Sequence, residues 1–188
     1  MGSKTKNRKW YALFSHTGGE INRVVMKLGV RPDSIITTNK NYEGFLTAQF
    51  RNRQEVEVFL ENSVEPYSLV TLHGYRYLLS RETLEVLYLK HITVVNIHPA
   101  PIFMRGAEFL KGIDPHERYY EFYKEFSHAM LGVTLHLVDA GVDTGQVIYG
   151  ICRIAKQGMS YDEFCSELLT MGTEAWLAVL PELLRLEE

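Results

Sequence analysis

The sequence predicts an α/β fold: a Rossmann-like, open, twisted and mostly parallel sheet with helices on both faces. Short apolar runs alternate along the chain with stretches of helical periodicity. The apolar runs are continuous rather than alternating, as in parallel strands that are covered on both sides. The 188 residues are 46% apolar and 23% charged, which suits a globular chain of about one domain.

The first part of the chain predicts a strand, a turn and a helix. Residues 1–9 are basic and polar, and we expect a flexible lead-in before a single domain at 10–188. Residues 10–15 form the first expected strand, and residues 16–19 form a turn with two glycines. The apolar residues that follow share one helical face before Gly29 ends the helix: Ile21, Val24, Val25 and Leu28.

The middle of the chain adds three expected strands and two expected helices. Continuous apolar runs place the strands at 33–38, 67–73 and 92–98. A helix is expected at 52–61, and Asp114 followed by proline predicts the start of another. The second helix is expected to carry one aromatic and apolar face: Tyr119, Phe122, Tyr123, Phe126 and Met130.

The last third predicts a hairpin and a final helix. Two apolar runs, 132–138 and 146–154, flank a short loop. Ser160 and Glu163 form a capping-box pattern, which predicts a helix that continues to Leu184. Ligands of such sheets sit at the carboxyl ends of the strands, so the residues that follow each strand are the first candidates for chemistry.

Composition excludes several classes of function. The net charge is −3 with no concentrated basic block, which argues against a nucleic-acid partner. Cys152 and Cys165 lack metal-type or disulfide-framework spacing, so we expect no metal and a reducing, cytoplasmic location. No apolar run reaches the roughly 18 residues that cross a bilayer, so no membrane partner is expected. Whether two copies of the chain form a homodimer is left open by the sequence.

The clearest candidate residues lie at the end of the strand at 92–98. Asn96 and His98 are two residues apart, so an extended backbone points both to the same side, and Pro99 favours that backbone. An amide donor beside an imidazole can bind a carbonyl oxygen and exchange a proton. The alternative is a buried histidine beyond a strand, with a turn-forming asparagine.

A second segment supports a functional interpretation. Residues 132–145 read G-V-T-L-H-L-V-D-A-G-V-D-T-G, in which a strand runs into a loop with two aspartates and two glycines. Asp143 in that loop is expected to orient or deprotonate an imidazole. Taken alone, this composition is also that of an ordinary turn. We expect His136, within the strand, to have a packing role.

These two segments together resemble the paired signature of the folate-dependent formyltransferases, N-I-H-P followed by G-V-T-L-H-L-V-D-A-G-V-D-T-G. The resemblance implies a formyltransferase-type sheet and transfer of a formyl group from 10-formyltetrahydrofolate to a primary amine, glycinamide ribonucleotide or a related small amine. It implies that Asn96, His98 and Asp143 are catalytic. The Asn96 amide and a protonated His98 would stabilise the oxyanion, Asp143 would hold His98, and no metal would be needed.

The resemblance also implies two sets of binding residues. Two segments would enclose the pterin of the folate cosubstrate: Tyr75, Arg76, Tyr77 and Leu78 on one side, and Val138, Asp139, Ala140 and Gly141 on the other. The amine acceptor would meet the first turn, a basic residue and an acid of the last helix: Thr17, Gly18, Gly19, Glu20, Arg105 and Glu174.

The first turn departs from the family pattern. The family's turn resembles G-N-G-S-N and cradles a phosphate of the acceptor, whereas here the chain reads H-T-G-G-E. The glycines still allow backbone N–H groups to face an anion, but Glu20 adds a negative charge where a phosphate would sit. Glu20 also suits a helix start by itself, so a structural role is equally expected. The acceptor then either lacks that phosphate or binds it elsewhere, for example at Arg105 or Lys111.

Other functions stay open at this point. An amino sugar or a modified nucleotide is the alternative acceptor. A hydrolase would use the same three residues with water as the nucleophile, and a folate-binding module would have no turnover. The presence of Asn96, His98 and Asp143 together argues against the module, whereas it does not separate transfer from hydrolysis.

Overall fold

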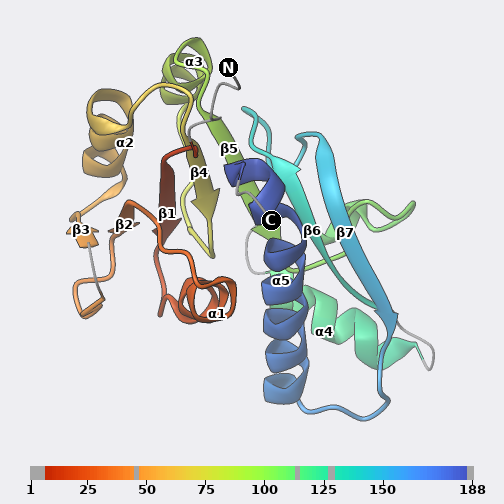
Figure 1. The fold of residues 1–188 in the computed structure, drawn as a ribbon. Helices are drawn as coiled ribbons and strands as arrows, with labels where there is room; N and C mark the ends of the chain where they lie inside the picture. Colours follow the sequence, from red (N-terminus) through yellow and green to blue (C-terminus); the bar gives the residue numbers. More distant parts are fainter. Residues whose placement is uncertain (1–6, 45–46, 113–114, 127–129, 186–188) are drawn as a thin grey trace, which may run out of the picture. The chain divides into compact units, whose positions relative to one another are not determined.

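The computed structural model describes residues 7–44, 47–112, 115–126 and 130–185. In these residues seven strands form a mostly parallel sheet of order β3-β2-β1-β4-β5-β6-β7, accompanied by five α-helices (Figure 1). This sheet confirms the predicted α/β class. The helix start predicted at Asp114, and the lead-in as far as residue 6, lie outside the described residues.

The chain divides into two compact units. Unit 1 comprises Met1–Val95 and Leu177–Glu188, and unit 2 comprises Asn96–Trp176. The boundary falls within β5 (Thr93–His98) and within α5 (Tyr161–Leu184). The single-domain organisation stays a prediction.

Parallel strands form the centre of unit 1. They are β1 (Trp10–Phe14), β2 (Ser34–Thr37), β3 (Thr47–Gln49) and β4 (Leu69–Leu72). Strand β1 pairs with β2 on one side and β4 on the other, and all of its residues are buried. This burial is what the continuous apolar run of β1 predicts.

Helix α1 (Gly19–Leu28) shows how the first turn is built. Its buried residues are the predicted Ile21, Val24 and Val25. The residue before it, Gly18, has a left-handed φ of 70°, and a Cβ atom there would lie 2.9 Å from both the Phe14 and Tyr42 rings. Glycine is therefore required at position 18 by backbone conformation and by space.

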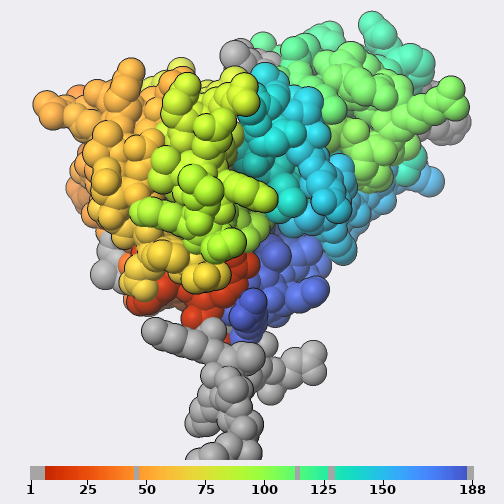
Figure 2. All heavy atoms as spheres, turned by 90° about the horizontal axis from the view of Figure 1, so that it is seen from above, coloured from red at the N-terminus to blue at the C-terminus, as the bar shows by residue number. Residues whose placement is uncertain are grey.

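Helices α2 (Arg53–Ser63) and α3 (Arg81–Leu89) lie side by side in unit 1. Figure 2 shows their surfaces next to each other, in orange and lime. The Asn52 side chain caps α2 by accepting from the Glu55 N–H at 3.0 Å, and Ser80 caps α3 through the Thr83 N–H. Glu57 of α2 accepts a hydrogen bond from the Ser80 N–H at 2.6 Å, which ties the two helices together.

Unit 2 is dominated by an antiparallel hairpin of β6 (Met130–Leu137) and β7 (Val147–Ile154), as predicted (Figure 1). The register shifts between Leu135 and His136, where the pairing partner passes from Tyr149 to Val147. Residue 148 is thus the additional residue of a bulge. The short 3-10 helix η1 spans Glu108–Leu110.

Helix α4 (Pro115–Glu125) packs its aromatic residues in the core of unit 2. Tyr119 and Tyr123 are buried, with ring centroids 5.3 and 5.4 Å from that of Phe164. The predicted helical face is wrong at its last two positions. Helix α4 ends at Glu125, so Phe126 follows the helix and is exposed, and Met130 begins β6.

The capping box that was predicted for the last helix is present. Glu163 N–H donates to Ser160 Oγ at 3.3 Å, and Ser160 N–H donates to Glu163 Oε2 at 2.8 Å. Helix α5 then runs from Tyr161 to Leu184. Within the described ranges no helix is both long and apolar enough to cross a bilayer.

Candidate functional site

Four polar side chains of unit 2 meet at the end of β5 and on the β6–β7 hairpin. The Asp143 carboxylate is their common partner. Its Oδ2 atom lies 3.2 Å from His98 Nδ1, and its Oδ1 atom lies 3.4 Å from Asn96 Nδ2. The fourth member is His136, whose Nε2 lies 3.3 Å from Asp143 Oδ1. The structure thus brings together the three residues that the sequence singled out.

Backbone geometry places Asp143 in this cluster. The residue lies in the loop between β6 and β7 and has a left-handed φ of 51°, a conformation that aspartate tolerates better than most residues. The Gly112 N–H donates to Asp143 Oδ2 at 2.8 Å, which ties the carboxylate to the segment after η1. Asp143 is only 13% exposed, so these contacts are largely shielded from water.

The surroundings of Asp143 favour its ionised form. Burial by itself raises the pKa of this carboxyl group. Hydrogen bonds from His136 and His98, the positive charge of His98 and the Gly112 N–H act in the opposite direction and outweigh it. The net result is a pKa of Asp143 well below its ordinary value, so the carboxylate stays charged at neutral pH.

Both ring nitrogens of His98 face acceptor oxygens. Its Nε2 lies 2.8 Å from the carbonyl oxygen of Leu110, which can only accept, so Nε2 is the donor of this hydrogen bond. Its Nδ1 lies 3.2 Å from the Asp143 carboxylate. The side chain of His98 is 4% exposed, so both contacts are shielded from water.

His136 is a member of the cluster that the sequence interpretation missed. Its Nδ1 donates to the Leu137 carbonyl at 2.8 Å. Its Nε2 lies 3.2 Å from Asn96 Nδ2 and 3.3 Å from Asp143 Oδ1. When the His136 ring is neutral, its Nε2 can accept a hydrogen bond from the Asn96 amide. When the ring is protonated, Nε2 can donate to the Asp143 carboxylate. The sequence feature that could have identified His136 is its position seven residues before Asp143, on the same hairpin.

The residues predicted to bind folate fall in both units. In unit 1, Ser15 anchors the segment 75–78: Arg76 N–H donates to Ser15 Oγ, and Ser15 N–H donates to the Gly74 carbonyl, both at 3.3 Å. Tyr77 and Leu78 are exposed there, whereas burial raises the pKa of Tyr75.

In unit 2, the loop 138–141 is shaped by Asp139, which accepts from the Gly141 N–H at 3.1 Å and from the Thr144 hydroxyl at 2.7 Å. Asp139 therefore organises its own loop. The neighbouring Ala140 and Gly141 are exposed, while Val138 is half-buried.

The residues predicted to bind the amine acceptor lie in both units and contact different groups. Glu20 Oε2 lies 2.9 Å from His73 Nδ1 in unit 1. In unit 2, Arg105 is exposed, and Glu174 is ion-paired with Arg153. Among the described residues no group of three or more His, Cys, Asp or Glu side chains is arranged to hold a metal ion.

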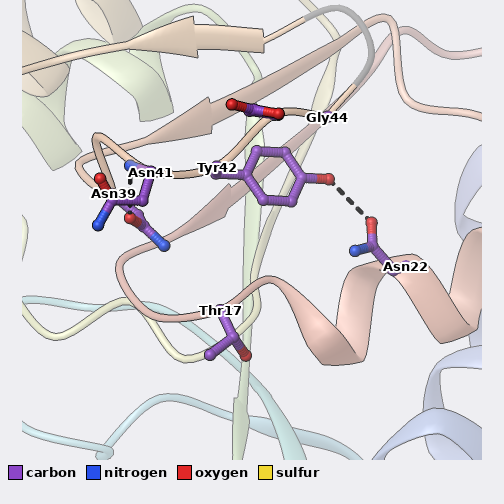
Figure 3. A pocket seen from close by; sticks show the side chains of 7 residues that line it. Thr17, Asn22, Asn39, Asn41, Tyr42 and Gly44 are labelled. Carbon is purple, nitrogen blue, oxygen red and sulfur yellow. Dashed lines mark hydrogen bonds between the residues drawn. The ribbon is translucent and has the colours of Figure 1, made fainter.

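Unit 1 also contains a cavity of about 470 Å³ beside the first turn (Figure 3). Polar side chains predominate in its lining, which comprises Thr17, Asn22, Asn39, Asn41, Tyr42, Glu43 and Gly44. The Tyr42 hydroxyl donates to Asn22 Oδ1 at 2.8 Å across one side of this cavity.

Solved structures that are similar to this chain include phosphoribosylglycinamide formyltransferases. The enzyme from Streptococcus pneumoniae TIGR4 superposes with a TM-score of 0.68 at 22% identity, over 95% of this chain and 97% of that one. The enzyme from Bacillus halodurans gives 0.72 at 20% identity, over 96% and 97%. That from Coxiella burnetii gives 0.74 at 16% identity, over 96% and 88%.

At the level of sequence, no family model matches the chain, and no curated protein is similar to it. The chain therefore has the fold of these formyltransferases at low sequence identity. This agrees with the fold that the two motifs led us to expect.

Proposed function

We propose that the protein transfers a formyl group from 10-formyltetrahydrofolate to a primary amine. The observation that carries this proposal is the cluster of Asn96, His98 and His136 around one ionised carboxylate, Asp143. The fold shared with phosphoribosylglycinamide formyltransferases supports it independently.

The cluster suits a reaction in which negative charge grows on a carbonyl oxygen. A buried imidazolium at His98 stabilises such charge electrostatically, and Asp143 keeps that imidazolium protonated. Both ring nitrogens of His98 already have protein partners, so we assign it a role through charge. The Asn96 amide supplies the hydrogen bond, since its 3.4 Å contact with Asp143 is long enough to be exchanged for a substrate oxygen.

Proton movement is the second requirement of the reaction. The attacking amine loses a proton and the leaving nitrogen of the folate gains one. His136 is a candidate for this step, because its Nε2 can hold a proton toward Asp143 or release it and accept from Asn96. The Leu137 carbonyl fixes its other nitrogen as a donor, so the exchange is confined to one atom.

10-Formyltetrahydrofolate supplies the formyl carbon in this proposal. Each of the two segments, considered within its own unit, has a feature that suits contact with a pterin. In unit 1, Ser15 anchors the segment 75–78, in which Tyr77 and Leu78 are exposed for contact with a ring. In unit 2, Asp139 stabilises the segment 138–141, in which Ala140 and Gly141 are exposed.

For the acceptor, glycinamide ribonucleotide is the reference compound, because the solved structures of this fold carry that name. A second acceptor class, an amino sugar or a modified nucleotide without a phosphate at the first turn, is favoured by the carboxylate of Glu20. The cytoplasmic location and a homodimer stay predictions.

The test is to incubate the protein with 10-formyltetrahydrofolate, with and without a panel of primary amines that includes glycinamide ribonucleotide. Loss of the formylfolate and gain of a formylated amine are followed by mass spectrometry. We expect turnover only when an amine is present. Formate release without an amine would instead assign a hydrolase, and binding of folate without either product would assign a non-catalytic module.

A further inference from the structure

The first turn carries a carboxyl group that the surrounding structure holds in place. Glu20 is the second residue of α1, and its Oε2 lies 2.9 Å from His73 Nδ1. The side chain of His73 is completely buried and that of Glu20 is 14% exposed. The carboxylate is therefore held at the start of the helix, where an anionic ligand would otherwise be attracted.

A chain of buried hydrogen bonds fixes His73 in turn. Its Nε2 lies 2.8 Å from Thr71 Oγ1, and the Trp10 indole N–H donates to the same oxygen at 2.8 Å. Trp10 is 1% exposed and Thr71 is fully buried in β4. The position of Glu20 is thus determined by the core of unit 1, not by the solvent around the turn.

The lining of the cavity beside this turn is also unfavourable to an anion. Its lining is made of amides, hydroxyls and one carboxylate, that of Glu43. Among the described residues that line it there is no Lys, Arg or His. Such a lining offers hydrogen bonds to hydroxyl groups and gives a phosphate no cation to pair with.

We propose that Glu20 is a specificity-determining residue that rejects a phosphate monoester at the first turn, and that the adjoining cavity binds an uncharged, hydroxyl-rich part of the amine acceptor. This inference rests on the proposed function and names the class of its acceptor. His73 is a positioning residue, which acts through Glu20. A phosphate placed beside this carboxylate would meet a like charge, which disfavours its binding, so one carboxylate can discriminate between acceptors.

The test compares two ligands that differ only in a phosphate, D-glucosamine and D-glucosamine 6-phosphate. Their binding to the full-length protein, without folate, is measured by ligand-observed NMR. We expect the wild-type protein to bind D-glucosamine about tenfold more tightly. In Glu20→Gln the preference is expected to fall by about tenfold, because the phosphate no longer faces a carboxylate. The ratio of the two affinities is the readout, which cancels effects on the shared sugar and amine.

Two variants control this measurement. Glu20→Asp keeps the charge and should keep the wild-type ratio. Glu85→Gln removes one charge from an exposed ion pair with Arg81 on α3, and should also leave the ratio unchanged.

The proposal is overturned if the wild-type protein binds the phosphorylated ligand equally well or better, if neither ligand binds at millimolar concentration, or if Glu85→Gln changes the ratio as much as Glu20→Gln. The assay contains no folate and needs no turnover. A failure here is therefore distinct from a failure of formyl transfer, which the amine panel measures separately.

Discussion

Replacement of Asp143 by asparagine removes the charge of the cluster and keeps most of its geometry. Both the Gly112 N–H and His98 Nδ1 contact Oδ2, at 2.8 and 3.2 Å, so an asparagine with its carbonyl oxygen in that place keeps both hydrogen bonds. Its amide group would then face His136 Nε2, which can accept. Asparagine also tolerates the left-handed φ of 51°. The variant should therefore fold and keep the two contacts of Oδ2. It should lose the negative charge and also the 3.4 Å hydrogen bond that Asn96 Nδ2 donates to Oδ1.

The expected costs follow chiefly from the loss of the charge. Charge-assisted hydrogen bonds become neutral ones, which lowers the free energy of unfolding at neutral pH by about 1–3 kcal/mol. His98 is no longer held as an imidazolium, so stabilisation of the oxyanion falls by about 2.7–4 kcal/mol, or roughly 10²–10³-fold in kcat. The assays are kcat for formyl transfer and thermal unfolding of the same samples.

The pH dependence gives a second readout. Because the pKa of Asp143 is depressed in the folded protein, its contribution to stability is fully present above the ordinary carboxyl pKa, about 3.9, and is lost as the pH falls toward the folded value. Wild-type stability should therefore decline below about pH 4, and Asp143→Asn should lack that part of the decline. A variant that retains kcat within threefold of wild type would refute the assigned role of the charge.

Three further variants test other parts of the structure. Asn96→Ala should lower kcat by roughly 10²–10³-fold with little change in Tm, because it removes one hydrogen-bond donor to the oxyanion; an unchanged kcat would remove Asn96 from the chemistry. His136→Gln should lower kcat, because it removes the ring nitrogen that contacts both Asp143 and Asn96, whereas an unaltered kcat would exclude His136 from proton transfer. Gly132→Ala should destabilise the fold by about 1–3 kcal/mol, since the added Cβ would lie 2.6 Å from Pro101 Cβ and 2.8 Å from the Ile151 carbonyl oxygen; a Tm equal to wild type would contradict that contact.

The strands were predictable because burial on both faces leaves a continuous apolar run, as in β1. Helix α3 was not predicted. Its buried positions are Thr83 and Leu87, whereas Tyr88 and Leu89 are 79% and 76% exposed, so apolar residues surround the helix and obscure its periodicity. The three-residue strand β3, Thr47–Gln49, carries no such run and was missed as well.

The site was predictable where side chains alone define it. The spacing of Asn96 and His98 on one strand, and Asp143 after another, led to three of the four members. The contacts made by the Leu110 carbonyl and the Gly112 N–H were not predictable, because every residue offers these groups and only the path of the chain selects them.

The bulge in the β6–β7 hairpin limits how this protein can vary in length. Ile148 is the additional residue, and it lies between the hairpin loop and the regular pairing of β7. Deletion of Ile148 would make the pairs Leu135–Tyr149 and His136–Val147 consecutive, and would remove the bend and extra twist that a bulge gives the hairpin next to its loop. Asp143 lies in that loop and contacts its histidines at 3.2 and 3.3 Å, so alignments that open a gap here would describe a chain whose polar cluster is oriented differently.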